Sequence, residues 1–310
     1  MKTNSFIHFS LLCIMVFANY SCGASKAASE IETIETVKLL ELYADSIYKD
    51  NEAVVLDESI KQEMRITEMS PFKHKSNIVY TFPSHLPTRY WQTEVRCRIK
   101  LHVSSIDHAS FSEIIYTSPS DSRTNLMRDF KGWIYSTDSL GVVSRRSLNK
   151  DETLNEQLND SLRIVKFQIK EDLQGKVLEY QYTVLMPYDI PFAPNKTVSA
   201  TGSSFPETAQ LPIRTFQRDI PVIQAKYEVS LPSFKNRVPK LINEVKQIGK
   251  GEMEIQKTTG SSSASTAWKG DRFTLDFTYD KYVVSAKNIP PYLDKSAPPL
   301  GVQIIRTEDW

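Results

Sequence analysis

One cysteine of this chain has histidines close to it in sequence. Cys97 is followed by His102 and His108, and a thiolate brought together with an imidazole could act as a nucleophile. The surrounding residues alternate between apolar and polar, which predicts a strand whose Cys97 and Ile99 face the core while His102 faces the opposite side. A reactive thiolate needs a partly exposed, electropositive setting. We therefore predict that Cys97 is a buried structural residue.

The other candidates for catalytic or metal chemistry lack the spacing that such sites require. Neither H-x-x-x-H nor H-E-x-x-H occurs, so no zinc site is predicted. The histidines after the N-terminal segment are His74, His85, His102 and His108. Ser261–Ser263 lie outside any G-x-S-x-G elbow, and no glycine-rich loop resembles a phosphate-binding loop. We predict no catalytic, cofactor-binding or metal-ligating residue.

Carboxylates leave one catalytic alternative open. Folding could bring two of them together as in a glycoside hydrolase, but a sequence does not show how far apart two carboxyl groups lie. Glu179 stands at the centre of the segment GKVLEYQY, where alternation places it with Gln181 and Thr183 on the outward face of a strand. We expect a solvated strand face there, with a cross-strand Lys or Arg beside Glu179.

The elements that must position these residues are read from two periodicities. Ser29–Lys49 begins with a capping-box pattern and has apolar residues at helical spacing, which predicts a helix. After Asp50 the period changes to two, which predicts strands with one buried and one solvated face. The four clearest strand segments are 94–103, 178–184, 225–231 and 273–280.

Strands with one solvated face are typical of antiparallel sheets, since parallel sheets are covered on both faces. We therefore predict an all-β fold, an antiparallel β-sandwich preceded by one N-terminal α-helix. Residues 187–212 contain five prolines and are expected to form a long loop or a boundary between two β subdomains. Thr258–Thr266 is predicted to be a mobile hairpin loop, and Pro239–Ile248 a short helix.

The N-terminus has the pattern of an export signal. A basic start and an apolar run from Phe6 to Phe17 lead into Ser21-Cys22-Gly23, which resembles the lipobox of bacterial lipoproteins. Cys22 is the expected lipid attachment residue, and the membrane is the expected partner of that lipid. The location this implies is the bacterial cell envelope, as a periplasmic or outer-membrane lipoprotein. Cleavage after Ala24, which would give a soluble secreted or periplasmic protein, is the alternative.

These patterns divide the chain into three parts. They are a signal peptide (1–21), an anchor, linker and helix (22–50) and a β-sandwich domain (51–310). A boundary between two β subdomains near 187–212 is the alternative to a single domain. Removing the signal leaves 37 basic and 37 acidic residues. Nucleic-acid binding rests on clustered Lys and Arg, so this balance argues against a nucleic-acid partner.

The order of several segments resembles a known family. The segments are Lys131–Glu152, Arg163–Val184, Phe216–Pro232 and Val283–Tyr292, with Asn51–Ser59 and Thr93–His102 as opening strands. Together they resemble a domain of unknown function that precedes transglutaminase-like cores in envelope proteins of Gram-negative bacteria. The resemblance implies a β-rich, exported, non-catalytic accessory domain. No such core stands before Trp310, so we expect the enzymology of the core not to transfer.

The expected function is therefore that of a binding or scaffold module. Tyr292, in a proline-rich segment, and Trp310 are the candidate partner contacts, because the resembling family carries its core beyond this region. The expected partner is another envelope protein or a peptide, and a separate transglutaminase-like protein is one form of it. A hydrolase using carboxylates assembled by the fold is the alternative.

The lipid anchor is tested at Cys22. A lipoprotein cysteine carries at least a diacylglyceryl group, and two or more acyl chains hold a protein firmly on a membrane. We expect the wild-type chain to incorporate labelled fatty acid and to resist a high-salt wash of membranes. Cys22→Ala should be released or left unprocessed. A wild-type chain that begins at Ser25 and carries no label would contradict the prediction.

Overall fold

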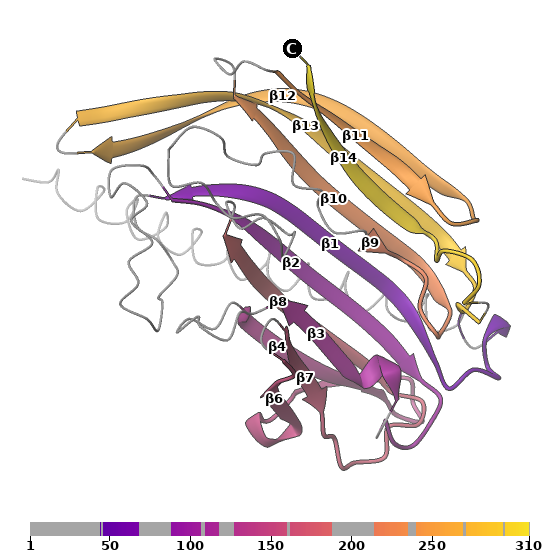
Figure 1. The fold of residues 1–310 in the computed structure, drawn as a ribbon. Helices are drawn as coiled ribbons and strands as arrows, with labels where there is room; N and C mark the ends of the chain where they lie inside the picture. The colour runs from indigo at the N-terminus through magenta and orange to yellow at the C-terminus, as the bar shows by residue number, and fades with distance from the viewer. Residues whose placement is uncertain are drawn as a thin grey trace, which may run out of the picture. The chain divides into compact units, whose positions relative to one another are not determined.

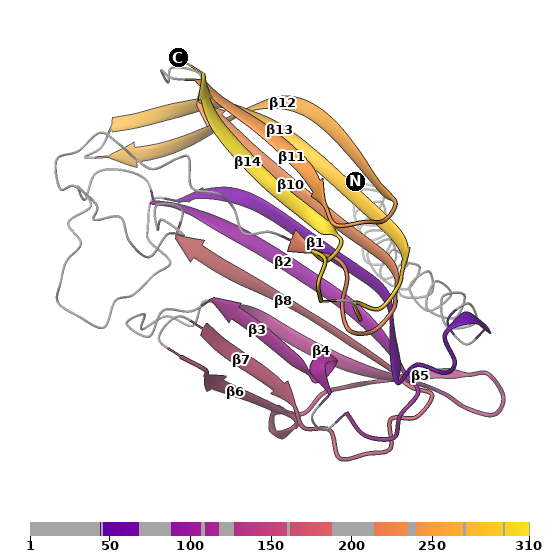
Figure 2. The same cartoon turned by 45° about the vertical axis from the view of Figure 1, so that its right-hand side comes forward.

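Strands dominate the computed structural model of this protein (Figures 1 and 2). It describes residues 44, 46–67, 88–106, 109–117, 127–159, 162–187, 214–234, 240–268, 271–293 and 295–309. Residues 48–310 belong to one compact unit, to which the following description applies. The predicted all-β class is confirmed. Of the predicted helix Ser29–Lys49, residues 44, 46 and 47 are helical and most of the others lie outside the described residues, as do Cys22 and the signal peptide.

The largest sheet has eight strands. In chain order they are β1 (Ala53–Thr67), β2 (Thr88–Leu101), β4 (Met127–Thr137), β5 (Val143–Ser147), β8 (Val177–Pro187), β10 (Val222–Phe234), β12 (Met253–Trp268) and β13 (Asp271–Ile289). Their order across the sheet is β12-β13-β10-β1-β2-β8-β4-β5. The four segments predicted from alternation belong to β2, β8, β10 and β13, with the last residues of the first segment running past the end of β2.

Two three-stranded antiparallel sheets complete the unit. One has the order β3-β7-β6 and contains β3 (Glu113–Thr117), β6 (Thr153–Gln157) and β7 (Leu162–Phe167). The other has the order β11-β14-β9 and contains β9 (Arg214–Thr215), β11 (Lys240–Ile248) and β14 (Gly301–Asp309). Short 3-10 helices, η1 (Ser110–Ser112) and η2 (Lys150–Glu152), immediately precede β3 and β6.

The large sheet is mixed, which corrects the prediction of a purely antiparallel fold. β1 pairs with β2 in the antiparallel sense and with β10 in the parallel sense, from Val55 opposite Val222 to Glu63 opposite Ser230. A register shift at Leu56 interrupts the pairing of β1 with β2. Alternation reports which face of a strand is buried, but the direction of its neighbour depends on pairing between distant segments.

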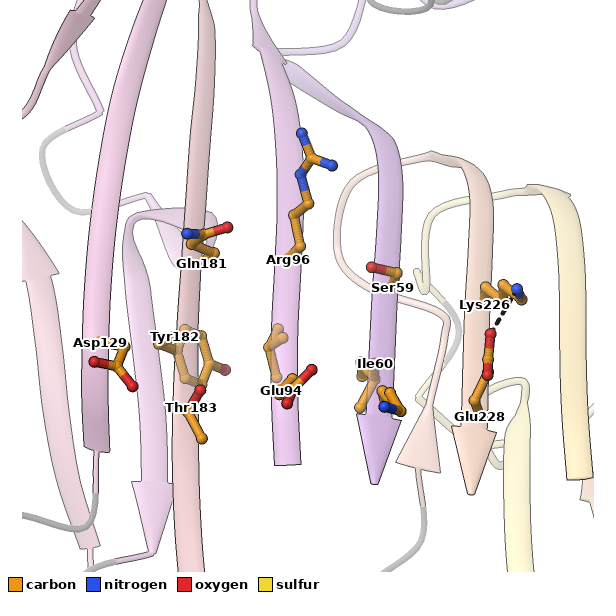
Figure 3. A pocket seen from close by; sticks show the side chains of 12 residues that line it. Ser59, Ile60, Glu94, Arg96, Asp129, Gln181, Tyr182, Thr183, Lys226 and Glu228 are labelled. Atoms are coloured by element: carbon orange, nitrogen blue, oxygen red, sulfur yellow. Dashed lines mark ion pairs between the residues drawn. The ribbon is translucent and has the colours of Figure 1, made fainter. Parts of the chain in front are cut away.

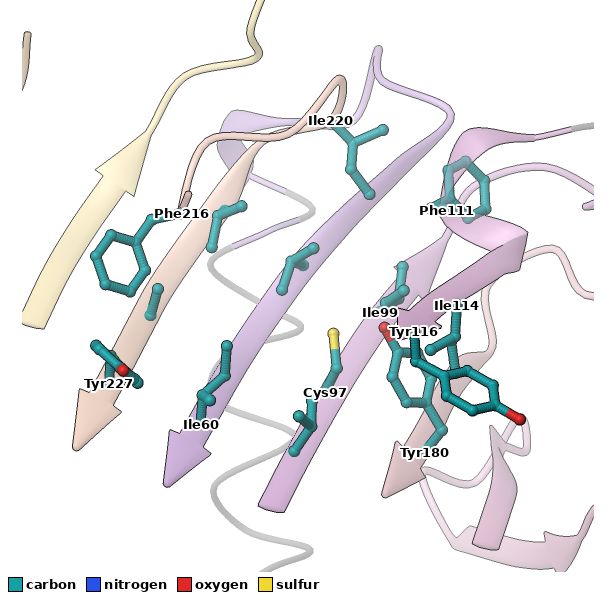
Figure 4. Close-up of a cluster of buried hydrophobic side chains, with 14 of the residues drawn as sticks. Ile60, Cys97, Ile99, Phe111, Ile114, Tyr116, Tyr180, Phe216, Ile220 and Tyr227 are labelled. Carbon is teal, nitrogen blue, oxygen red and sulfur yellow. The ribbon is translucent and has the colours of Figure 1, made fainter. Parts of the chain in front are cut away.

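The hydrophobic core lies on one face of the large sheet and is shared with both small sheets (Figure 4). Ile60, Cys97, Tyr180 and Tyr227 contribute from the large sheet, and the rings of Phe167 in β7 and Tyr180 in β8 lie 5.5 Å apart. The core residues outside the large sheet include Phe111, Ile114, Tyr116, Phe216, Val302 and Ile304. Strands in two layers around one core make a sandwich. The opposite face of the large sheet is called the outer face below.

Two local predictions were wrong. Thr258–Thr266, predicted to be a hairpin loop, lies within β12, whose pairing with β13 runs from Met253 to Trp268. Pro239–Ile248 was predicted to be a helix, but Lys240–Ile248 forms β11 along β14. In β11 the side chain of Asn243 is buried while Ile242 is 47% exposed, so the strand does not follow the apolar residues used for the helix prediction. In both segments strand pairing outweighs local composition.

β14 lies between β11 and β9 and joins the core. Val302 and Ile304 are fully buried, while Gly301 pairs with both Ile248 and Thr215. The segment after Tyr292 therefore returns to the sandwich through β14.

The contribution of β14 is tested by Ile304→Ala. Removing a fully buried isoleucine should lower the free energy of unfolding by about 2–5 kcal/mol, measured by urea denaturation. Ile242→Ala on the neighbouring β11 is the matched control, since this exposed side chain should change stability by less than about 0.5 kcal/mol. Equal effects of the two substitutions would contradict the assignment of β14 to the core.

Candidate functional site

Cys97 lies within the hydrophobic core, as predicted. Its side chain is fully buried, and burial raises the pKa of the thiol to about 12. The Nδ1 atom of His102 lies 2.8 Å from the carbonyl oxygen of Asn51, so its ring is engaged with the main chain. His74, His85 and His108 lie outside the described residues. A thiol with this pKa stays protonated near neutral pH and is a poor nucleophile.

Glu179 is the centre of a buried network, which corrects the prediction of a solvated strand face. Its side chain is 4% exposed, because neighbouring side chains close over it. Its carboxylate accepts hydrogen bonds from Arg96 Nε at 2.8 Å, Arg98 Nε at 3.1 Å and the Tyr135 hydroxyl at 2.8 Å. Arg98 also donates to Asp57 at 2.8 Å. The outward direction and the cross-strand arginine were predicted, and only the solvation was wrong.

The network holds Glu179 ionised. Burial disfavours its charge, but the charges of Arg96 and Arg98 and the hydrogen bonds from Arg96 and Tyr135 outweigh burial and lower the pKa of Glu179. The pKa of Asp57 is raised, because burial outweighs its pairing with Arg98. Burial and the charge of Glu179 also raise the pKa of the Tyr135 hydroxyl. Glu179 is thus a structural anion and a poor proton donor at neutral pH.

A second ion pair lies on the core side and was not predicted. Glu58 is 4% exposed and forms an ion pair with Arg218, which precedes β10. The register shift at Leu56 changes the phase of β1, so that Glu58 lies opposite Cys97 and turns inward. Gln62, on the same inward face, accepts a hydrogen bond from the Tyr227 hydroxyl at 2.6 Å. The sequence carries no signal of the phase change.

A groove crosses the outer face of the large sheet (Figure 3). It has a volume of about 530 Å³ and includes residues of β4, β8, β2, β1 and β10, which are neighbours in the sheet. Two cross-strand rows supply most of its polar side chains: Gln181, Arg96, Ser59 and Lys226 in one, and Thr183, Glu94, Lys61 and Glu228 in the other. Ile60, Val95, Tyr182 and Asp129 complete the lining.

Most charges of the groove are paired. Arg96 bonds Glu179, Lys61 lies 3.4 Å from Glu63, and Glu228 binds both Lys226 at 2.6 Å and Lys281 at 2.9 Å. Hydrogen bonds from Lys226 and Lys281 lower the pKa of Glu228. Glu94 accepts a hydrogen bond from Gln92 at 2.7 Å. The charges of the groove are therefore nearly balanced.

A second candidate surface surrounds Tyr292. A pocket of about 540 Å³ is lined by Tyr292, Leu293 and Pro298 together with Gln217 and Lys250. The Tyr292 hydroxyl donates to the carbonyl oxygen of Ala297 at 2.6 Å, so the ring is held in place. Leu293 is 81% exposed. Trp310, the other candidate partner contact, lies outside the described residues.

Within the described part of the chain, no three His, Cys, Asp or Glu side chains gather where they could hold a metal ion. The same residues contain no helix that is long and apolar enough to cross a bilayer.

Comparisons with known proteins give only distant likenesses, all among solved structures. No protein-family model matches the chain, and no curated protein matches it. Among solved structures, the chain is similar to one described as "a putative protease from Parabacteroides distasonis", with a TM-score of 0.43 and 11% sequence identity. The match covers 82% of this chain and 40% of that one, so the chain spans about two fifths of the length of that protein.

The Glu179 network predicts an acid-sensitive stability. The pKa of Glu179 in the fold lies below its usual value of 4.5, so its stabilisation is present above about pH 4.5 and is lost as the pH falls. Glu179→Gln should cost about 1–3 kcal/mol at pH 7 and reduce the loss of stability between pH 5 and 3, measured by urea denaturation across pH.

Glu156→Gln is the control, because Glu156 is exposed and lies 3.8 Å from Lys166 at the surface. It should keep the stability and the acid profile of the wild type. Asp57 shares Arg98, and its raised pKa contributes stability at low pH that is lost as the pH rises. Asp57 is present in both proteins, so the test compares the pH profile of the variant with that of the wild type. Parallel pH profiles for wild type and Glu179→Gln would contradict the prediction.

Proposed function

We propose that this chain is an exported, lipid-anchored envelope protein whose β-sandwich is a non-catalytic binding module. The groove across the outer face of the large sheet is its binding surface. The observation that carries this proposal is the groove itself: an open cavity of about 530 Å³ to which five neighbouring strands contribute polar side chains. A pocket with a few convergent polar groups is the usual form of a binding site.

The protonation states around the groove support binding rather than catalysis. A general acid needs a pKa close to the working pH. The pKa values of Glu228 and Glu179 are lowered by their basic partners, so both carboxylates hold their charge and give up no proton near neutral pH. The thiol of Cys97 is buried on the other side of the sheet.

Export and partner capture are the remaining parts of the proposal. The apolar run before Cys22 and the resemblance to an envelope accessory domain support a lipid anchor and an envelope location. The pocket at Tyr292 is the proposed contact for an envelope protein or peptide, such as a separate transglutaminase-like partner. Trp310 is proposed as a separate contact.

A hydrolase is the alternative function, and one observation favours it. Glu94, Asp129 and Glu228 line the same groove from β2, β4 and β10, so three carboxylates do share one face. Glu94 and Asp129 are separated by one strand, which corresponds to about 10 Å between their main chains. Cleavage of a ligand by the wild-type protein, lost in Glu94→Gln, would establish this alternative.

The binding function is tested by filling the groove. Ser59 is exposed between Arg96 and Lys226, and Ser59→Trp should place an indole ring across the groove. We expect the wild-type chain to retain a component of solubilised envelope fractions, identified by mass, and Ser59→Trp to lose it without a change in melting temperature.

Ser285→Trp is the matched control. Ser285 lies opposite Lys226 on β13, in the same cross-strand row as Ser59 but outside the groove. This variant should retain the component. Capture that survives Ser59→Trp, or that is lost equally in both variants, would overturn the groove as the binding surface.

A further inference from the structure

We infer that the groove binds a neutral, hydroxyl-rich chain, an oligosaccharide, and that Asp129 and Gln181 hold its hydroxyl groups. This inference rests on the proposed binding function and assigns a ligand class to the same groove. Three features carry it: an unpaired carboxylate that a bulge directs into the groove, a set of unpartnered neutral polar groups, and the absence of a net charge to attract an ionic ligand.

Asp129 occupies an unusual backbone position. Its φ is +54°, in the left-handed region that few residues other than glycine adopt, Asn and Asp most readily among them. The residue lies where the pairing of β4 with β8 shifts between Arg128 and Lys131, and this irregularity directs it into the groove (Figure 3). Bulges of this kind are known to re-aim side chains at binding sites.

The carboxylate of Asp129 is exposed at the groove. No described residue forms an ion pair or hydrogen bond with its carboxylate, and the residue is exposed. A carboxylate has two oxygens that accept hydrogen bonds, so it can accept from two adjacent hydroxyl groups of one sugar ring. The carboxylate that the bulge directs into the groove is therefore available to bind hydroxyl groups of a ligand.

Neutral polar side chains lie beside Asp129. Gln181 and Thr183 on β8 and Ser59 on β1 line the groove, and none of the three side chains has a hydrogen-bond partner among the described residues. An amide donates and accepts, and so does a hydroxyl. The hydroxyl groups of a sugar also do both, so they can satisfy this mixed set without introducing a charge.

The charges of the groove select against an ionic ligand. Arg96 is neutralised by Glu179, and Glu228 binds Lys226 and Lys281. Asp129 has basic neighbours in Arg128 and Lys131, so a cationic ligand gains little attraction there. The lining contains three basic and three acidic side chains, so neither a polyanion nor a polycation meets a complementary field along the whole groove.

The dimensions of the groove favour a chain over a single sugar. The strands from β4 to β10 are five neighbours, and adjacent strands are about 4.8 Å apart, so the lining spans about 19 Å. Asp129 lies at one end of this span, and Lys226 and Glu228 lie at the other (Figure 3). A ligand that contacts both ends must be an extended oligomer.

The inference is tested with the full chain on an array of neutral, anionic and cationic oligosaccharides, followed by calorimetric titration of the neutral binders. We expect binding to neutral oligosaccharides, tighter for hexasaccharides than for disaccharides. Asp129→Asn and Gln181→Ala should weaken it about tenfold, the size expected for a lost hydrogen bond to the ligand. Asn tolerates a positive φ, so Asp129→Asn should fold normally.

Ser285→Ala, in the same row outside the groove, should bind as the wild type does. Three results would each overturn the inference: no neutral oligosaccharide bound, a preference for charged ones, or affinity unchanged in both groove variants. If envelope capture is lost in Ser59→Trp while no neutral sugar binds, the ligand class is wrong and the binding function stands. If Ser59→Trp leaves capture intact, the proposed function itself fails.

Discussion

The parallel pairing of β1 with β10 is the interaction on which the rest of the structure depends. It joins β2, β4, β5 and β8 on one side of β1 to β12 and β13 beyond β10, and makes one sheet of eight strands. Without it, the groove would lose Lys226 and Glu228, and the core would lose the contribution of Tyr227. The two strands are joined by main-chain hydrogen bonds, which residues of almost any type can form. The amino-acid composition of β1 and β10 therefore does not predict that they pair.

Two irregularities of strand pairing decide where polar groups point. The shift at Leu56 turns Glu58 into the core, where Arg218 neutralises it, and leaves Asp57 on the outer face beside Arg98. The shift in β4 directs Asp129 into the groove without a partner. A buried charge is tolerated only when it is paired, so the first shift requires an arginine while the second creates an open site.

The sequence predicted those features that depend on local alternation. It placed Cys97 in the core and Glu179 with Gln181 and Thr183 on the opposite face, because a strand has a strict period of two. It failed where distant pairing decides the outcome. β11 and the Ser/Thr-rich part of β12 are strands because β14 and β13 provide partners, and the groove combines side chains from five strands that no local pattern connects.

The central position of β14 has a consequence for folding during synthesis. β9 and β11 precede β14 in the chain, yet they meet only through it, since it lies between them in their sheet. A growing chain that has reached Leu300 therefore carries both strands with open edges and lacks Val302 and Ile304 in the core. Open strand edges invite pairing with other chains. This sheet can pair only after β14 has been made, so we expect a chain that ends before β14 to be prone to aggregation.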